Sequence, residues 1–500
     1  MKFERASGIL LHPTSLPGQY GIGDLGPQAY HFIDWLSSTG CKLWQVLPLG
    51  PTGYGDSPYQ CFSAFAGNPY LISPELLLQD GLLTQDDLHD MPDFNASLVD
   101  FGTLIPWKLN LLLKAFSRFA SAPETLHKEF EYFCAENVAW LDDYALFMSI
   151  KEANGGGAWH EWDKTIRTRK KSAMDKARKE HAESVQRFSF YQFLFFRQWN
   201  NIRKYANERH IKIIGDIPIF IAYDSADAWA NPDLFFLDEN SLPTVVAGVP
   251  PDYFSPTGQL WGNPLYRWDV HKESSYVWWL DRFRAVLKLV DVVRLDHFRG
   301  FAGYYEIPFG AKTAEHGRWV PGPGSDFFKV LDEKLSDART PELDLPIIAE
   351  DLGVITPDVV ELRDGFKLPG MKILQFGFDG AKNPFLPHNY PAHCVAYTGT
   401  HDNDTARGWF DSAPEHERNF ALRYLNTDAN RFVWELIRSI WSSVAVYAVT
   451  PMQDALNLDG AARMNFPSRL GGNWEWRMQA KDMNEQLAAS LRELNQLYLR

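Results

Sequence analysis

The sequence predicts an α/β protein built on a (β/α)8 barrel, the TIM barrel. Eight short apolar segments alternate with amphipathic helical segments along the 500 residues. No GxGxxG motif follows the first segment, which disfavours the alternative, a doubly wound open sheet with a nucleotide site. Three segments lead into a carboxylate, and strand ends are where barrel enzymes carry their chemistry. The predicted strands lie near residues 9, 44, 213, 292, 347, 373, 396 and 446.

The charge of the chain argues against two classes of partner. Lys and Arg total 49 against 63 Asp and Glu, a formal net charge of −14. A nucleic acid or an anionic membrane surface attracts proteins of the opposite charge, so we expect neither as a partner. No apolar run reaches membrane-spanning length, and the first residues lack the apolar core of a signal peptide. We expect a cytoplasmic protein, or a plastid one if the chain is a processed mature form.

Cysteine and aromatic content narrow the chemistry further. The four cysteines lie far apart without a CxxC pair, which argues against a zinc cage or a disulfide framework. Aromatic residues make up 14% of the chain, including 18 Trp. Trp at this frequency is hard to bury completely, and exposed aromatic faces pack well against the flat faces of sugars. The composition is therefore compatible with a sugar ligand, without establishing one.

Two interruptions of the barrel pattern predict insertions. Residues 106–119, 126–144 and 185–207 have apolar residues three or four apart, so a mainly helical insertion is expected over about 56–200. We interpret its basic run, 167–179, as a solvated helix face. The segment 222–276 is dense in Pro, Gly and aromatic residues, which predicts a loop-rich, substrate-binding insertion. Residues 1–500 then form a single catalytic barrel with subdomains inserted after strands 2, 3 and 4.

The stretch 289–300 is the strongest candidate for a catalytic segment. Residues 290–295 are mainly apolar and rich in valine, as expected of a buried parallel strand, and Asp296 follows at the exit. Arg294 and Asp296 are two residues apart and therefore share one face of the strand. The plain alternative is that these two side chains form an ion pair without further role.

Asp296, Glu350 and Asp402 follow the fourth, fifth and seventh predicted strands. In a barrel these ends converge on one face, so the three carboxylates are expected to meet. Such a set fits retaining glycoside chemistry, in which one carboxylate attacks the anomeric carbon and a second acts as acid and then as base. Arg294 would keep the nucleophile ionised, and a less solvated Glu350 would hold its proton longer.

Two alternatives for these carboxylates stay open at this point. Acidic residues at strand ends often cap the following helix, a role that suits Asp351 better than Glu350. The segment 401–404 could bind a divalent metal, although it lacks the Gly and the distal Glu of a calcium loop. We predict no metal site and no cofactor.

Several motifs resemble those of the 4-α-glucanotransferases, the amylomaltases or disproportionating enzymes of glycoside hydrolase family 77. The resemblance covers nearly the whole chain and is weakest over 80–200. It implies a β/α barrel with inserted subdomains and no separate C-terminal β-domain. The motifs are RLDHFR at 294–299, AEDLG at 349–353 and THDNDT at 400–405, with further matches at 8–15, 215–218, 251–255, 463–465 and 472–474.

The resemblance also implies roles for single residues. Asp296 would be the nucleophile, Glu350 the general acid and base, and Asp402 the stabiliser of the transition state. Tyr54 would contact glucan at a more distant site, where its expected aromatic partner is Phe101, which lacks a hydroxyl. The implied substrate-binding residues are Arg294, His401, Asp216, Tyr253, Phe254, Tyr54, His297, Trp261 and Asn465.

The implied reaction transfers a segment of an α-1,4-glucan to the 4-hydroxyl of another glucan or of glucose. Maltooligosaccharides, amylose and glucose would be the donors and acceptors, and the protein would be a monomer or a homodimer. The nearest alternative is a retaining hydrolase of the α-amylase type, because the same three carboxylates would serve it. An alternative from another class is a catalytically silent glucan-binding protein, which the presence of all three carboxylates disfavours.

Overall fold

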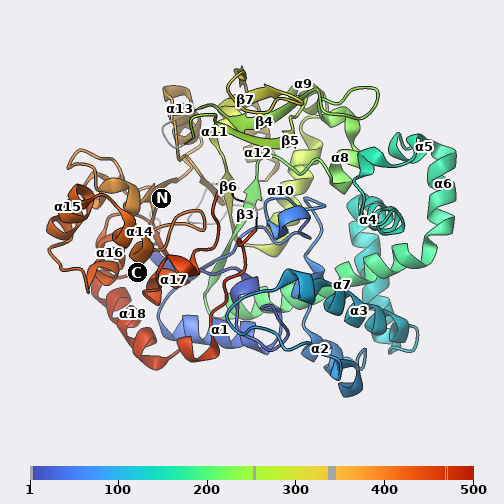
Figure 1. Ribbon diagram of the computed structural model, residues 1–500, viewed down its shortest axis with the longest axis horizontal. Helices are drawn as coiled ribbons and strands as arrows, with labels where there is room; N and C mark the ends of the chain where they lie inside the picture. The colour runs from blue at the N-terminus through green and yellow to red at the C-terminus, as the bar shows by residue number, and fades with distance from the viewer. Residues whose placement is uncertain (1–3, 252–254, 336–344, 468, 470) are drawn as a thin grey trace.

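The structure is a computed structural model that describes residues 4–251, 255–335, 345–467, 469 and 471–500. Eight strands, parallel at every pairing, close into a barrel in the order β1-β12-β11-β10-β9-β6-β3-β2 (Figure 1). The predicted TIM barrel is confirmed, with a strand at each of the eight predicted positions. The strands are β1 (Ala6–Leu10), β2 (Leu43–Gln45), β3 (Lys212–Pro218), β6 (Val292–Asp296), β9 (Ile347–Ala349), β10 (Gly370–Ile373), β11 (Cys394–Tyr397) and β12 (Tyr447–Pro451).

The interior of the barrel is a packed apolar core that ends in polar side chains. Every barrel strand contributes buried residues to one cluster, among them Ile214 of β3 and Val292 of β6. Side chains two apart on a strand share a face, so Asp216 and Arg294 project inward directly above those two residues. The register places Asp216 opposite Arg294 on the neighbouring strand. The strand pattern itself therefore brings two predicted site residues together.

Helices of the β/α units and of the C-terminal part surround the barrel (Figure 1). Helix α13 begins with Thr356 at its N-cap and Pro357 as its first residue, a favoured start because the first helical position needs no backbone N–H donor. The helices are α1 (Pro27–Ser38), α10 (Val277–Leu289), α11 (Arg299–Ala302), α12 (Gly324–Lys334), α13 (Pro357–Gly365), α14 (Ala406–Ser412), α15 (Glu415–Leu425), α16 (Phe432–Ser442), α17 (Met452–Ala455) and α18 (Glu485–Tyr498).

The chain between β2 and β3 is helical and gathers on one side of the barrel (Figure 1). The predicted helices exist but are longer than expected. Helix α3 starts before Pro106 because the Asp100 side chain accepts a hydrogen bond from the Thr103 amide and caps the new start. The helices are α2 (Pro74–Gln79), α3 (Phe101–Phe119), α4 (Glu124–Ala153), α5 (Lys164–Arg167), α6 (Lys171–Glu180) and α7 (Ala182–Glu208).

The basic run 167–179 is not one helix face. Helix α5 ends at Arg167 and α6 starts at Lys171, and between them Arg169 has a left-handed φ of 52°. Most of the run is exposed, as predicted, but the Arg169 guanidinium forms an ion pair of 2.7 Å with Asp143 on α4. That contact and the cation–π contact with Trp229 anchor the break between the two helices.

The segment 222–276 is more regular than predicted. It contains two short helices and two strands, and these strands belong to one four-stranded sheet with two strands that follow β6. More than half of its described residues still lie outside these helices and strands. Strand β4 was not predicted because its partner β7 comes from residues about sixty positions further along the chain, beyond the reach of local patterns. The elements are α8 (Ala226–Ala230), β4 (Val245–Val249), β5 (Gln259–Pro264), α9 (Trp268–Glu273), β7 (Gly303–Pro308) and β8 (Arg318–Pro321), and the sheet order is β5-β4-β7-β8.

The described chain after β12 forms helices and irregular loops, with no further strand. Helix α18 returns to the start of the chain, where the Asn495 side chain accepts a hydrogen bond from the Ser7 hydroxyl on β1. No helix among the described residues combines the length and the apolar character needed to cross a membrane.

Candidate active site

Strands β3 and β6 build a buried charge cluster at the exit of the barrel. The Arg294 guanidinium donates to the Asp216 carboxylate at 2.6 Å and lies 2.7 Å from that of Asp296. The side chains of Arg294 and Asp216 are almost inaccessible, whereas that of Asp296 is 27% exposed. Burial raises the pKa of Asp216 to about 7 against the opposing effect of Arg294. Arg294 thus joins a hidden carboxyl group to one that faces the solvent.

Glu350 follows strand β9 and lies beside this cluster. Its carboxylate accepts hydrogen bonds from the backbone amides of His297, at 2.7 Å, and Leu352, at 3.0 Å. Burial and then the charge of Asp296 raise the pKa of Glu350 to about 8, although Arg294 and the two amides lower it. A carboxyl group with this pKa holds its proton at neutral pH, as predicted from its lower solvation.

Asp351, by contrast, caps no helix. Its carboxylate accepts from the Met371 amide at the start of β10 and pairs with Arg363 on α13. The capping alternative therefore does not apply to Asp351, whose carboxylate is directed toward β10 and Arg363. Glu350 and Asp351, adjacent in sequence, therefore serve different neighbours.

Asp402 lies on the loop after β11, which ends five residues earlier at Tyr397. The Asn465 side chain donates to its carboxylate at 2.6 Å, and the His401 ring lies 3.4 Å from its other oxygen. The Asp402 side chain is 47% exposed, while His401 is buried and its pKa is lowered, chiefly by that burial. The sequence motif around Asn465 thus meets the motif around Asp402, as the predicted site requires.

Tyr59 connects the two sides of the site, and sequence reasoning missed it. Its hydroxyl donates to Asp216 at 2.9 Å, and its ring stacks on that of His401 with centroids 5.0 Å apart and an interplanar angle of 13°. Trp474 adds a third ring, 5.9 Å from each of the other two. The loop that carries Tyr59 has no hydrophobic periodicity from which a role could be predicted. The only signal in the sequence is its content of Gly and aromatic residues shortly after strand β2.

His297 has a strained backbone with a left-handed φ of 50°. Burial lowers its pKa to about 4, so the ring is neutral at pH 7. Trp261 of β5 contacts this ring edge to face, with centroids 4.9 Å apart. The turn after β6 therefore presents both the His297 ring to the cleft and its amide to Glu350.

These groups border an open cleft of about 870 Å3 above the barrel. Three buried site residues lie behind the cleft surface. Arg294 and Asp216 are connected to it by the contact of Arg294 with Asp296, and Glu350 by its hydrogen bond from the His297 amide. The Tyr54 side chain, Tyr253 and Phe254 lie outside the described part of the structure. Six of the predicted site residues line the cleft, namely Trp261, Asp296, His297, His401, Asp402 and Asn465.

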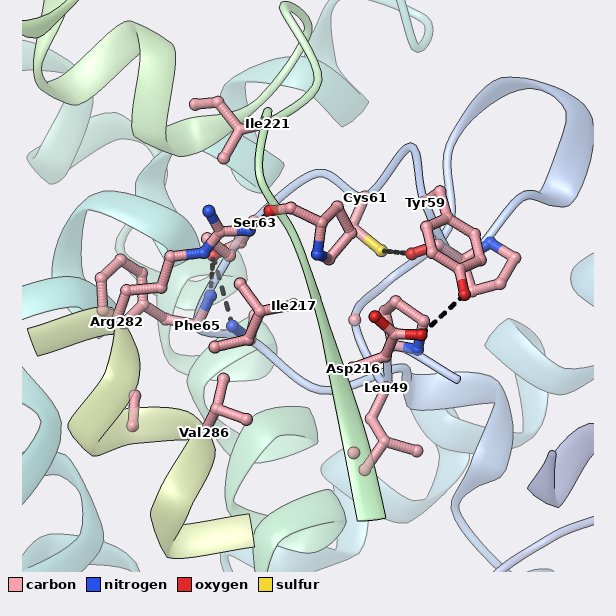
Figure 2. Close-up of a pocket in the computed structure, with 18 of the residues that line it drawn as sticks. Leu49, Tyr59, Cys61, Ser63, Phe65, Asp216, Ile217, Ile221, Arg282 and Val286 are labelled. Carbon is pink, nitrogen blue, oxygen red and sulfur yellow. Dashed lines mark hydrogen bonds between the residues drawn. The ribbon is translucent and has the colours of Figure 1, made fainter. Parts of the chain in front are cut away.

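A second, small cavity of about 70 Å3 lies behind strand β3. Figure 2 shows it with Asp216 and Tyr59 at one end and Arg282 and Phe65 at the other. It is much smaller than the open cleft and shares Tyr59, Pro218, Phe220 and Ala222 with it as lining residues. Among the described residues, no three His, Cys, Asp or Glu side chains are grouped so that they could hold a metal ion.

The comparisons with known proteins agree on one family. The family model described as 4-alpha-glucanotransferase matches residues 11–483. The chain belongs to the 4-alpha-glucanotransferase family. It is 50% identical to the 4-alpha-glucanotransferase of Thermus thermophilus and 49% identical to that of Synechocystis, covering 98% or more of each chain. The family predicted from the sequence motifs is thereby confirmed.

Solved structures give the same result for the fold. The amylomaltase from Streptococcus agalactiae in complex with acarbose superposes with a TM-score of 0.95 at 41% identity, with 99% of each chain covered. The amylomaltase from Corynebacterium glutamicum, at 18% identity and a TM-score of 0.79, shows the shared fold alone. The charge cluster described above therefore belongs to a 4-alpha-glucanotransferase scaffold.

Proposed function

We propose that the protein transfers a segment of an α-1,4-glucan to the 4-hydroxyl of another glucan or of glucose by a retaining double displacement. One observation carries the mechanism. A protonated Glu350, with a pKa of about 8, lies in electrostatic contact with Asp296, which the Arg294 guanidinium holds at the cleft surface. Two carboxyl groups in different environments can act as acid and nucleophile at the same pH.

In the first step Glu350 gives its proton to the glycosidic oxygen as the bond from that oxygen to the anomeric carbon breaks. An Asp296 oxygen bonds to the same carbon, and the freed sugar leaves with the proton. Arg294 donates to Asp296 and Asp216 together, so the attacking carboxylate is oriented before substrate arrives. The remaining Asp296 surface faces the cleft.

In the second step the 4-hydroxyl of an acceptor sugar gives its proton to Glu350 and attacks the anomeric carbon. The bond to Asp296 breaks, and the new α-1,4 link restores the original configuration. The two backbone amides on Glu350 keep its carboxylate in place while it is unprotonated between the steps.

Asp402 and His401 bind sugar hydroxyls on the opposite side of the cleft. Asn465 fixes the Asp402 carboxylate, and the stacked Tyr59 ring and the tilted Trp474 ring keep His401 from rotating. A fixed carboxylate near the reacting carbon stabilises the positive charge of an oxocarbenium-like transition state. The neutral His401 ring contributes a hydrogen bond without adding a positive charge there.

Transfer requires the acceptor sugar to compete successfully with water. Trp261 on β5 lines the cleft and supplies an aromatic contact for the acceptor. The family resemblance assigns the same role to Tyr253 and Phe254, which lie outside the described residues. Tyr54 supplies a more distant glucan contact. Maltooligosaccharides, amylose and glucose are the proposed donors and acceptors.

The decisive test is incubation with pure maltotriose, in which products are separated by length and reducing ends are counted. Transfer yields glucose and a ladder of longer maltooligosaccharides at constant reducing ends. Rising reducing ends with shorter products alone would identify a hydrolase of the α-amylase type. The variant Asp296→Asn removes the nucleophile and is expected to abolish turnover while glucan binding remains measurable, and surviving turnover would refute its role.

A further inference from the structure

A separate groove lies between the helical region and the barrel, bounded by α4, α8 and α10. Its volume is about 670 Å3, within the usual size range of ligand sites and close to that of the catalytic cleft. The two hollows share no lining residue. One long wall consists of residues on one face of α4, spaced about one turn apart, and includes Trp140. The opposite wall consists of similarly spaced residues of α10 and includes Trp278.

The groove contains a cluster of aromatic rings. The rings of Phe65 and Trp140 are nearly parallel, with centroids 6.4 Å apart and an interplanar angle of 14°. Phe196 lies 5.8 Å from Trp140, and Trp278 meets Phe65 edge to face at 5.9 Å. Phe65, Trp140 and Phe196 are half-buried, so part of each ring faces the solvent of the groove. Such rings offer apolar faces to a ligand with apolar C–H faces.

Hydrogen-bonding groups surround these rings. The exposed side chains of Glu136 on α4, Asp281 on α10 and Asp233 after α8 line the groove, together with the amides of Asn137 and Asn231. These groups can bind the hydroxyls of a ligand whose C–H faces lie on the rings. Such pairing of aromatic faces with carboxylates and amides suits a neutral polyhydroxyl molecule.

The charges of the lining exclude other occupants. Five carboxylates against two basic side chains disfavour an anionic ligand. The core of a protein–protein interface is depleted of charged residues, whereas charged side chains occur along both walls of this groove. A second copy of this chain, or a helix of another protein, would have to remove these charged side chains from water, which costs free energy.

We propose that this groove binds a segment of α-1,4-glucan outside the catalytic cleft. The proposal rests on the proposed function, because that function makes the glucan polymer available to the protein. The loop 57–66 connects the two hollows, with Tyr59 in the cleft and Phe65 in the groove, on either side of the small cavity (Figure 2). One long glucan could therefore be held at two places, which raises its apparent affinity.

The test measures the retention of an inactive protein, Asp296→Asn, in native gels that contain amylopectin. Adding Trp140→Ala removes one aromatic contact and is expected to weaken retention about two- to tenfold. The matched control is Tyr132→Ala, which removes a 69% exposed aromatic from the same helix outside the groove and should leave retention unchanged. In the active protein, Trp140→Ala should lower kcat/KM for amylose more than for maltotriose.

A second variant tests the proposal even if Trp140→Ala does not fold. Ala139 is exposed on the same groove wall, so Ala139→Arg fills the groove without removing any packing and should weaken retention similarly. Unchanged retention in a folded Ala139→Arg protein would overturn the proposal, as would a shift in sedimentation that identifies the groove as a protein interface. Retention is measured with an inactive protein and so does not depend on turnover. A negative maltotriose test would therefore refute the proposed function without deciding whether the groove binds glucan.

Discussion

The two sides of the catalytic cleft differ in their exposure to water. On the side of β3, β6 and β9, Arg294, Asp216 and Glu350 are buried, and burial raises the pKa values of both carboxyl groups. On the side of β11, Asp402 is half-exposed and is held by the neutral side chain of Asn465. In the proposed mechanism the first side controls protons and charge, and the second presents a fixed carboxylate to the substrate.

This difference shows why similar side chains are suited to different tasks. A buried carboxyl group keeps its proton until a step requires it, because desolvation penalises the charged form. An exposed carboxylate stays available to substrate hydroxyls, and its position depends on neighbours such as Asn465. Five experiments would test this division of roles.

Replacing Glu350 with Gln should have the largest effect among these five. The amide keeps the shape but has no proton to give, so kcat should fall about 10²- to 10⁴-fold, as measured with maltotriose.

The raised pKa of Glu350 means that its contribution to stability is lost as pH rises from 4.5 to about 8. Glu350→Gln should therefore be more stable than the natural protein at pH 9, by a few kcal/mol in chemical unfolding. Equal stability at that pH would argue against the buried, protonated state.

Replacing Arg294 with Met should damage activity and stability together. Two carboxylates would lose their shared partner, and breaking a buried ion pair costs about 3 to 5 kcal/mol. Chemical unfolding and maltotriose kinetics measure the two losses. Arg294→Lys restores the charge but not both hydrogen bonds, so it should recover stability more than activity. Full activity in Arg294→Lys would show that charge alone is sufficient.

The pH profile should have a basic limb near pH 8. Glu350 must be protonated in the first step, and its pKa is raised from 4.5 to about 8, so kcat/KM should fall about tenfold per pH unit above that value. Initial rates between pH 5 and 10 provide the measurement. The residual activity of Glu350→Gln should lack this limb, and a limb at the same pH in that variant would assign it to another group.

Replacing Asn465 with Ala should affect the other side of the cleft more mildly. Asp402 would lose the 2.6 Å hydrogen bond that orients it, and a hydrogen bond to a charged group contributes about 1.5 to 3 kcal/mol. We expect a fall in kcat/KM of about ten- to a hundredfold, with the basic limb of the pH profile unchanged. A shifted limb would show that the two sides are electrostatically coupled.

Replacing Tyr59 with Phe should have the smallest effect. The ring contacts with His401 and Trp474 remain, and Asp216 keeps its bond to Arg294, so only one hydrogen bond of about 1 kcal/mol is lost. Activity should fall a few-fold, whereas Tyr59→Ala should cost far more because the stack is lost. Equal losses in both variants would assign the role of Tyr59 to its hydroxyl.

Some features were predictable because they depend on short stretches of sequence. A buried strand needs a local apolar run, so all eight barrel strands were found, and with them the strand ends that carry Asp296 and Glu350. Barrel geometry brings strand ends to one face whatever the intervening chain does, which is why residues so far apart were expected to meet. The motifs also identified Asp402 and Asn465, whose contact the structure contains.

Other features depend on contacts that no local pattern contains. Strand β4 exists because β7 pairs with it, and Tyr59 belongs to the site because its loop folds over β3 to reach Asp216 and His401. The pKa of Glu350 is likewise set by burial and by Asp296, 54 residues earlier in the chain. The amino-acid sequence alone was sufficient to predict the barrel and the family, and to locate the three carboxylates proposed for catalysis. The solvation and the partners of these carboxylates depend on the tertiary structure, because desolvation and long-range pairing arise when distant segments pack together.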